Sequence, residues 1–142
     1  MLYKFIIEEK LPSLNDYINK LKSPNGQRVG AGFKSKVDNI CLSYILPHKR
    51  QLTALCKQPV LIHFQWHEKT KRRDLDNVYS AKKYILDAMQ KAGVIENDNY
   101  KHIKGLYDGI TYGKRDYVEI TVFTKKSYLK EFASKEIARL EK

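Results

Sequence analysis

One segment, residues 59–93, constrains the fold more than any other. Within it, residues 60–67 alternate between two faces, one of which carries Val, Ile, Phe and Trp, and this period of two predicts a strand. Residues 77–92 then repeat apolar side chains at helical spacing, and Gly93 follows at a position that suits a helix C-terminus. A strand and a helix that adjoin bury their apolar faces together, so we expect an α+β fold: a small mixed β-sheet packed with helices.

The rest of the chain supplies further strands and helices. A first strand is expected at Tyr3–Glu8, followed by a short helix for which Ser13 is a suitable N-cap. Other elements are expected at 33–44 and 52–56 (helices), at 102–110 and 117–124 (two strands joined as a hairpin through 112–116), and at 127–142 (a helical tail). The chain shows no repeat, long linker or boundary. We therefore expect residues 1–142 to form a single domain.

Charge is the strongest compositional signal. The 27 Lys and Arg residues outnumber the 16 Asp and Glu residues, giving a formal net charge of +11. This imbalance favours a polyanionic partner, most often nucleic acid, although a merely soluble basic protein would look the same. No apolar run approaches the roughly 20 residues that span a bilayer, and the N-terminus does not resemble a signal peptide, so a cytoplasmic protein is expected. Both cysteines, Cys41 and Cys56, lack metal or redox spacing and are expected to be reduced thiols.

The segment 23–32 has the composition of a loop. It holds three glycines and Pro24, and lysines flank it on both sides. Such a loop, with Arg28 inside it, could become ordered on a phosphate backbone or could be a plain surface loop. The composition does not separate the two.

Two carboxylates directly after a basic run carry the chemistry. Asp74 and Asp76 follow Lys69, Lys71, Arg72 and Arg73. In an extended chain, both aspartates would project from one face, about 7 Å apart, and could share a divalent cation. The alternative is a solvated turn in which Asp76 caps the next helix.

The helix after this motif adds two polar residues. On a continuous helix, Lys83 and Asp87 fall on the same stripe as Asp76, with the apolar side chains opposite. A lysine there could stabilise charge on a scissile phosphate, although a solvated helix face with a Lys–Asp pair would look similar. Beyond Gly93, Asp98 could fold back as a third carboxylate, with Glu96 as its local competitor. Three carboxylates would suit Mg²⁺, with Mn²⁺ as a substitute.

These motifs resemble the RusA-type Holliday junction resolvases, a family encoded mostly by prophages. The resemblance rests on Arg73-Asp74-Leu75-Asp76-Asn77, then Lys83-Tyr84-Ile85-Leu86-Asp87-Ala88-Met89, then Gly93-Val94 and Asp98. Leu11-Pro12-Ser13-Leu14-Asn15 is similar to the start of the family pattern. The spacing from Asp76 to the Asp-Ala element is about one helical turn longer than in the type member. Lys82 is therefore a rival to Lys83, and the tail after Lys125 has no clear counterpart.

The resemblance implies a homodimeric, Mg²⁺-dependent endonuclease that resolves four-way DNA junctions by paired, symmetric nicks in recombination and repair. It implies that Asp74, Asp76 and Asp98 bind the metal and that Lys83 is the essential lysine. The residues expected to contact DNA are Asn15, Arg28, Lys69, Lys71, Arg72, Arg73 and Asn77. The alternatives are a junction-binding protein that does not cleave and a nuclease that prefers flaps or forks.

Overall fold

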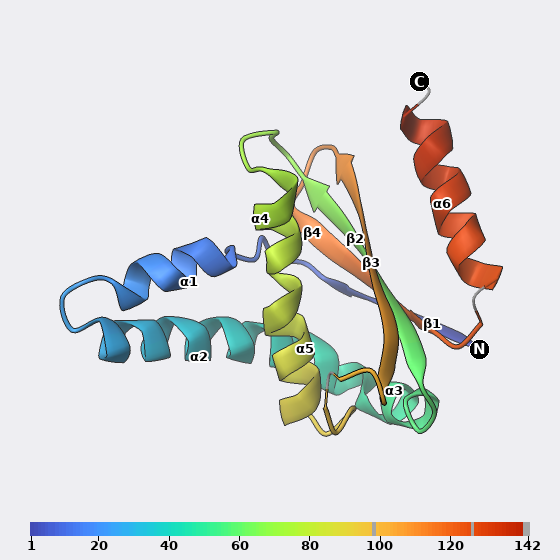
Figure 1. Cartoon of the computed structure of the whole chain (residues 1–142), viewed down its shortest axis with the longest axis horizontal. Coiled ribbons are helices and arrows are strands. Elements are labelled where there is room, and N and C mark those ends of the chain that lie inside the picture. Colours follow the sequence, from blue (N-terminus) through green and yellow to red (C-terminus); the bar gives the residue numbers. More distant parts are fainter. Residues whose placement is uncertain (98, 126, 141–142) are drawn as a thin grey trace.

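The computed structural model describes residues 1–97, 99–125 and 127–140 as a four-stranded sheet with helices on both sides (Figure 1). The order is β1 (Leu2–Ile7), α1 (Leu14–Leu21), α2 (Gly26–Ile45), a short 3₁₀ turn η1 (Leu46–His48), α3 (Lys49–Leu55), β2 (Val60–Glu68), α4 (Leu75–Ser80), α5 (Lys82–Lys91), β3 (Ile103–Tyr112), β4 (Tyr117–Phe123) and α6 (Ser127–Leu140). The expected α+β fold with a small mixed sheet is confirmed.

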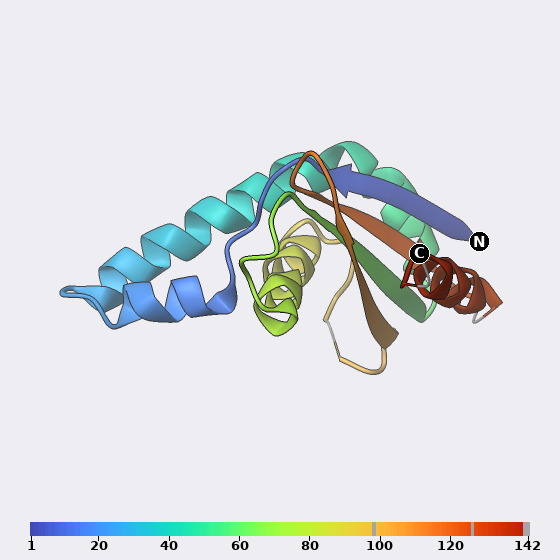
Figure 2. The same ribbon diagram turned by 90° about the horizontal axis from the view of Figure 1, so that it is seen from above.

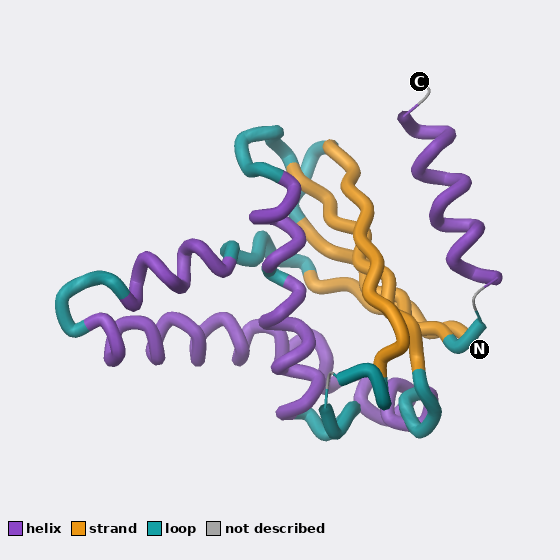
Figure 3. Tube along the Cα trace, viewed as in Figure 1, coloured by secondary structure: helices purple, strands orange, loops and turns teal. Residues whose placement is uncertain are grey.

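The sheet has the strand order β1-β4-β2-β3, drawn as adjacent orange strands in Figure 3. β2 is parallel to β3 and antiparallel to β4, while β4 is antiparallel to β1. β2 takes a central position because both of its faces are largely buried, and a strand buried on both faces belongs inside a sheet. The carboxyl ends of β2 and β3 therefore lie at the same edge.

The hairpin expected between the last two strands is wrong. β3 and β4 do not pair with each other, because β2 lies between them. The connection at 113–116 instead crosses the end of β2. There the amide of Gly113 donates to the carbonyl of Glu68 at 2.9 Å, and the amide of Lys69 donates to Asp116 Oδ1 at 2.8 Å. A turn-like sequence between two strands thus indicated a reversal of direction but not which strands are neighbours.

The main core lies between the sheet and helices α2, α3 and α5, as the view from above shows (Figure 2). The apolar face of β2 contributes Val60, Ile62, Phe64 and Trp66, all at most 3% exposed. From the helix after the acidic motif, the expected core residues Val78, Ala81, Ile85, Ala88, Met89 and Ala92 are all buried. Among the described residues, no helix combines the length and apolar character needed to cross a membrane.

Residues 23–32 do not form the expected loop. Ser13 caps α1 through a reciprocal bond with Asp16, a short turn follows, and α2 already begins at Gly26. Asn25 makes the turn in the left-handed conformation, at φ 57°. Glycine lowers helix propensity, but here it lets two helices approach closely, since a Cβ on Gly30 would strike the side chain of Leu21. Packing between α1 and α2 therefore outweighs the loop-like composition.

The single helix expected at 77–92 is divided in two. α4 ends at Ser80 and α5 begins at Lys82, with Ala81 between them. The amide of Ala81 bonds to the carbonyl of Val78 and the amide of Tyr84 to that of Ala81, which is the tighter i to i+3 pattern. The two helices run nearly in line (Figure 1). Because the helix is interrupted at Ala81, however, Asp76 and Asp87 do not lie on one stripe of a continuous helix.

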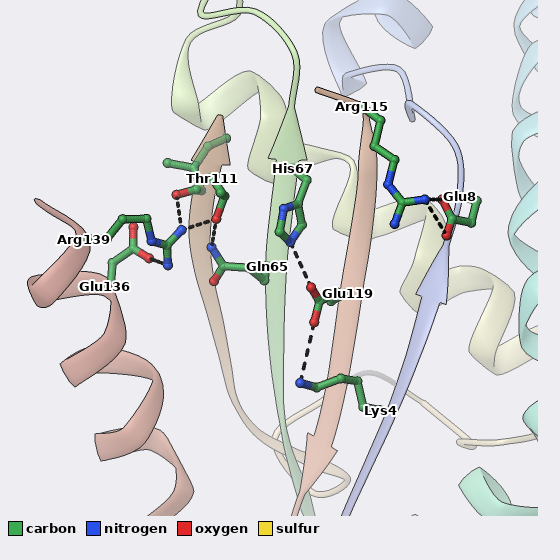
Figure 4. Close-up of polar contacts among 10 residues, drawn as sticks. Lys4, Glu8, Gln65, His67, Thr111, Arg115, Glu119, Glu136 and Arg139 are labelled. Atoms are coloured by element: carbon green, nitrogen blue, oxygen red, sulfur yellow. Dashed lines mark hydrogen bonds and ion pairs between the residues drawn. The ribbon is translucent and has the colours of Figure 1, made fainter. Parts of the chain in front are cut away.

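The opposite face of the sheet is polar and is crossed by α6. Figure 4 shows His67 bonded to Glu119, which also pairs with Lys4, while Arg139 of α6 reaches Thr111 and, through it, Gln65. Phe132 anchors the helix by stacking on His63, with ring centroids 4.0 Å apart. The tail is helical as expected, but its apolar residues Ile137 and Leu140 stay 55% and 79% exposed.

Candidate metal and DNA site

Asp74 and Asp76 lie where the loop from β2 enters α4, at the sheet edge formed by the carboxyl ends of β2 and β3. Both are exposed. Asp74 is at the N-cap position with extended backbone angles, and Asp76 lies in the first helical turn, where its Oδ1 accepts from the amide of Asn77 at 3.0 Å. The extended geometry expected for the pair is therefore wrong beyond Asp74, because the helix begins at Leu75. The helix cap is Asp74 rather than Asp76.

Within the described ranges, neither aspartate forms an ion pair with a neighbouring side chain. Among the residues that the structure describes, no lysine or arginine forms an ion pair with Asp74 or Asp76. Two exposed carboxylates separated by one residue repel each other, and a bound cation relieves that repulsion. The pair thus has oxygen ligands available at the surface.

Arg73 differs from the other residues of the basic run. Its guanidinium donates to Glu68 Oε1 at 2.6 and 2.9 Å and to the carbonyl of Leu11 at 2.9 Å. Glu68 is only 4% exposed, so this pair fixes the loop to the end of β2 and to the segment before α1. We assign Arg73 a positioning role in the loop.

The other three basic residues of the loop are exposed to solvent. Lys69 has a loose 4.0 Å contact with Asp116, and Lys71 lies over the ring of Tyr112 at 5.2 Å from its centroid. Together with Arg72 they give the loop that precedes Asp74 and Asp76 a positive charge, which attracts phosphate.

Two asparagines join α1 to α4 beside the acidic pair. The Nδ2 of Asn15 donates to the Oδ1 of Asn77 at 2.7 Å, and the amide of Leu14 donates to the hydroxyl of Ser80 at 3.1 Å. Both asparagines were expected to contact DNA on the basis of the resemblance. The structure brings them together next to Asp76, the neighbour of Asn77 in the chain.

The two candidate lysines point to different parts of the fold. Lys83 forms an ion pair with Asp87 at 3.0 Å, and Asp87 also binds Lys34 of α2 at 3.0 Å. Burial alone would raise the pKa of Asp87, but hydrogen bonds from Lys34 and Lys83 outweigh it and lower that pKa. Lys83 and Asp87 thus form the Lys–Asp pair of the alternative interpretation, in a network that links α5 to α2.

Lys82 is bound by a carboxylate that sequence analysis missed. Its ammonium pairs with Asp108 of β3, which also accepts a 2.9 Å bond from Trp66 Nε1. The same ammonium lies 5.9 Å from the ring centroids of Phe64 and Tyr79. The sequence signal for this residue was a single acid, Asp108, within a predicted strand. Its position opposite Phe64 and beside α5 follows only from the strand pairing.

Asp98, the predicted third carboxylate, lies outside the described residues. Its local competitor Glu96 follows the C-terminal end of α5 and lies 3.8 Å from His102, whereas Asp74 and Asp76 are at the start of α4. Within the described part of the chain, no group of three or more His, Cys, Asp or Glu side chains could hold a metal ion. The donor set there is the Asp74–Asp76 pair, whose hard oxygens fit Mg²⁺, an ion that keeps several waters.

Comparisons with known proteins do not assign this chain to a family. No family model matches the chain. No curated protein matches it either.

Proposed function

We propose that this protein is a Mg²⁺-dependent, structure-specific endodeoxyribonuclease that acts as a homodimer and resolves Holliday junctions by paired, symmetric nicks. The observation that carries the proposal is the exposed Asp74–Asp76 pair at the start of α4, bordered by Lys69, Lys71 and Arg72. Carboxylates of this kind would hold the divalent cation, with Asp98 as the third ligand. The cation would supply Lewis-acid chemistry for phosphodiester hydrolysis.

The residues of the chain have separable tasks in this proposal. Lys69, Lys71 and Arg72 bind the phosphate backbone, while Arg73 and Glu68 hold the loop that carries the two aspartates. Asn77, fixed by Asn15, is positioned to donate a hydrogen bond to a phosphate oxygen beside Asp76. Lys83 provides positive charge for the scissile phosphate. Dimer symmetry would present two such sites to a symmetric junction.

A junction-binding protein that does not cleave is the second candidate. One observation favours it: the net charge of +11 favours binding to a polyanion but supplies no chemistry for cleavage. Such a protein would still have the basic loop and the high positive charge that bind DNA.

Two assays on the same preparation separate these candidates. A labelled four-way junction is titrated with protein in EDTA to measure binding, then incubated with Mg²⁺ to measure nicking. Symmetric nicks in opposing strands that require Mg²⁺ support the nuclease. Tight binding by the dimer with no nicking in Mg²⁺ or Mn²⁺ contradicts it and supports the binding protein.

The same cleavage assay decides the substrate. Rates are compared on a junction, a fork, a flap and a plain duplex of matched sequence. The proposal expects the junction to be cut fastest. Faster cutting of flaps or forks would support a nuclease but contradict junction resolution as its function.

A further inference from the structure

The helices α1 and α2 form an arm that projects from the body of the protein. Figures 1 and 2 agree that α1 and the N-terminal half of α2 extend beyond the sheet, with the turn between them at the tip. α1 spans Leu14–Leu21 and begins at the Asn15–Asn77 bond, so the base of the arm adjoins the acidic pair.

Close packing makes this arm rigid. A Cβ added to Gly26 would overlap the carbonyl of Leu21, and one added to Gly30 would strike the Leu21 side chain. Further along, the rings of Tyr17 and Phe33 stack with an 8° angle between their planes. The two helices therefore pack as one unit, from which the exposed side chains of the arm project.

Beyond Asp16, which lies in the first turn of α1 at the base of the arm, the charge of the arm is entirely positive. Residues 17–37 contain five basic residues and no acidic residue. Lys34 is occupied by Asp38 and Asp87 at the base. The other four are exposed: Lys20, Lys22, Arg28 and Lys36.

We propose that this arm binds the phosphodiester backbone of a DNA duplex and guides it to Asp74 and Asp76. The inference rests on the proposed function for the identity of the acidic site, but the binding itself does not require cleavage. α1 rises about 1.5 Å per residue, so its end lies about 10 Å beyond Asn15, or about three nucleotides along a strand. The arm would then hold phosphates roughly three nucleotides from the nick.

A second copy of this chain is the competing occupant. The arm also exposes apolar side chains, with Ile18 42% and Val29 41% exposed, which suits a protein surface. However, pairing two copies of the arm would bring like charges together, because residues 17–37 contain no acid to offset them and Asp16 is the one acid of α1. Charge complementarity therefore favours a polyanion.

The test replaces Lys20, Lys22 and Arg28 together by Gln. The matched control replaces Lys49, Arg50 and Lys57 of the α3 region by Gln, which removes the same number of exposed charges at another surface. Binding to a 30-base-pair duplex and to a four-way junction is measured in EDTA over a range of salt concentrations. We expect the arm variant to bind at least tenfold more weakly at about 150 mM salt, with a salt slope reduced by about two to three, and the control to change less than threefold.

Three outcomes would overturn the inference. These are unchanged binding by the arm variant, equal losses in both variants, and a change in oligomeric mass of the arm variant without DNA, which would assign the arm to a second copy. The inference and the proposed function fail separately. If the arm variant binds DNA weakly but the wild-type protein never nicks it, the DNA-binding role of the arm stands and the nuclease proposal fails. If the wild-type protein nicks junctions but the arm variant binds DNA normally, the nuclease proposal stands and the role of the arm fails.

Discussion

The side-chain amide of Asn15 donates a 2.7 Å hydrogen bond to the side-chain oxygen of Asn77. This bond connects α1 to the helix that begins at the acidic pair, across 62 positions of sequence. It fixes the orientation of the Asn77 amide, whose nitrogen is then directed away from Asn15 and can serve a phosphate.

Replacing Asn15 by Ala should release Asn77. We expect a loss of about 1 kcal/mol or less in the free energy of unfolding, because an exposed hydrogen bond contributes little net stability. The rate of junction cleavage should fall by more than this small loss of stability explains, since Asn77 loses its fixed orientation. Asn19→Ala, on the same helix, is the control. Equal cleavage by the two variants would remove Asn15 from the site.

The glycines of α2 should respond differently to alanine. A Cβ on Gly26 would overlap the backbone of Leu21, whereas Gly32 has open space around it. We expect Gly26→Ala to lower the free energy of unfolding by about 1–3 kcal/mol and Gly32→Ala to raise it by about 0.5–1 kcal/mol. Urea unfolding measures both. Destabilisation by Gly32→Ala as large as that by Gly26→Ala would contradict the close packing of the arm.

His63 should make stability depend on pH. Burial, with a smaller contribution from Lys4, lowers the pKa of this histidine to about 4 from an ordinary 6.5. Between these values, the unfolded chain takes up a proton that the folded chain does not. Stability should therefore fall as the pH drops from about 6.5 towards 4, by about 2.5 kcal/mol at pH 4.5.

The variant His63→Phe isolates this effect. It keeps an aromatic ring against Phe132 and removes Nδ1, a buried atom without a hydrogen-bond partner in the described part of the protein. We expect the difference in unfolding free energy between variant and wild type to shift in favour of the variant between pH 7.5 and pH 4.5. A constant difference across this range would show that His63 titrates normally in the folded protein.

The two candidate lysines should separate structure from catalysis. In Lys83→Gln, Asp87 keeps its ion pair with Lys34, while cleavage should fall about 100-fold or more because the positive charge at the scissile phosphate is lost. Lys82→Gln removes the ion pair of Asp108 and leaves it, among the described residues, with the Trp66 hydrogen bond, so it should destabilise the fold by about 1–3 kcal/mol. Unfolding and cleavage are measured on both variants. A wild-type rate of cleavage by Lys83→Gln would show that Lys83 is not the essential lysine.

The fold was predictable wherever a local pattern decides structure. The alternation from Val60 to His67 and the capping residue Ser13 both predicted the correct elements, since periodicity and capping act within a few residues. The strand order was not predictable, because the segment 113–116 looks like a hairpin turn and only the central position of β2 excludes that pairing. The same limit applies to α2. Its glycines indicate a loop in the sequence, and only the structure shows that they allow close packing against Leu21.

The candidate site shows the same division. The motif located Asp74 and Asp76, which the structure leaves exposed at the start of α4. It could not show that Arg73 is held by a buried Glu68 five residues earlier, nor that Lys82 is paired with Asp108 across 26 residues. A helical projection also joined Asp76 to Lys83 on one stripe, and the break at Ala81 divides that stripe.

The central claim is that Asp74 and Asp76 hold the metal ion for cleavage. Asp76→Asn keeps the size of the side chain and removes one charge, and Glu131→Gln, an exposed change on α6, is its control. Both are assayed for binding to a four-way junction in EDTA and for nicking in Mg²⁺. We predict that Asp76→Asn binds the junction as tightly as wild type or more tightly, because a charge that repels phosphate is gone, and no longer nicks it. Nicking by Asp76→Asn at a rate near that of wild type and of the control would contradict the claim.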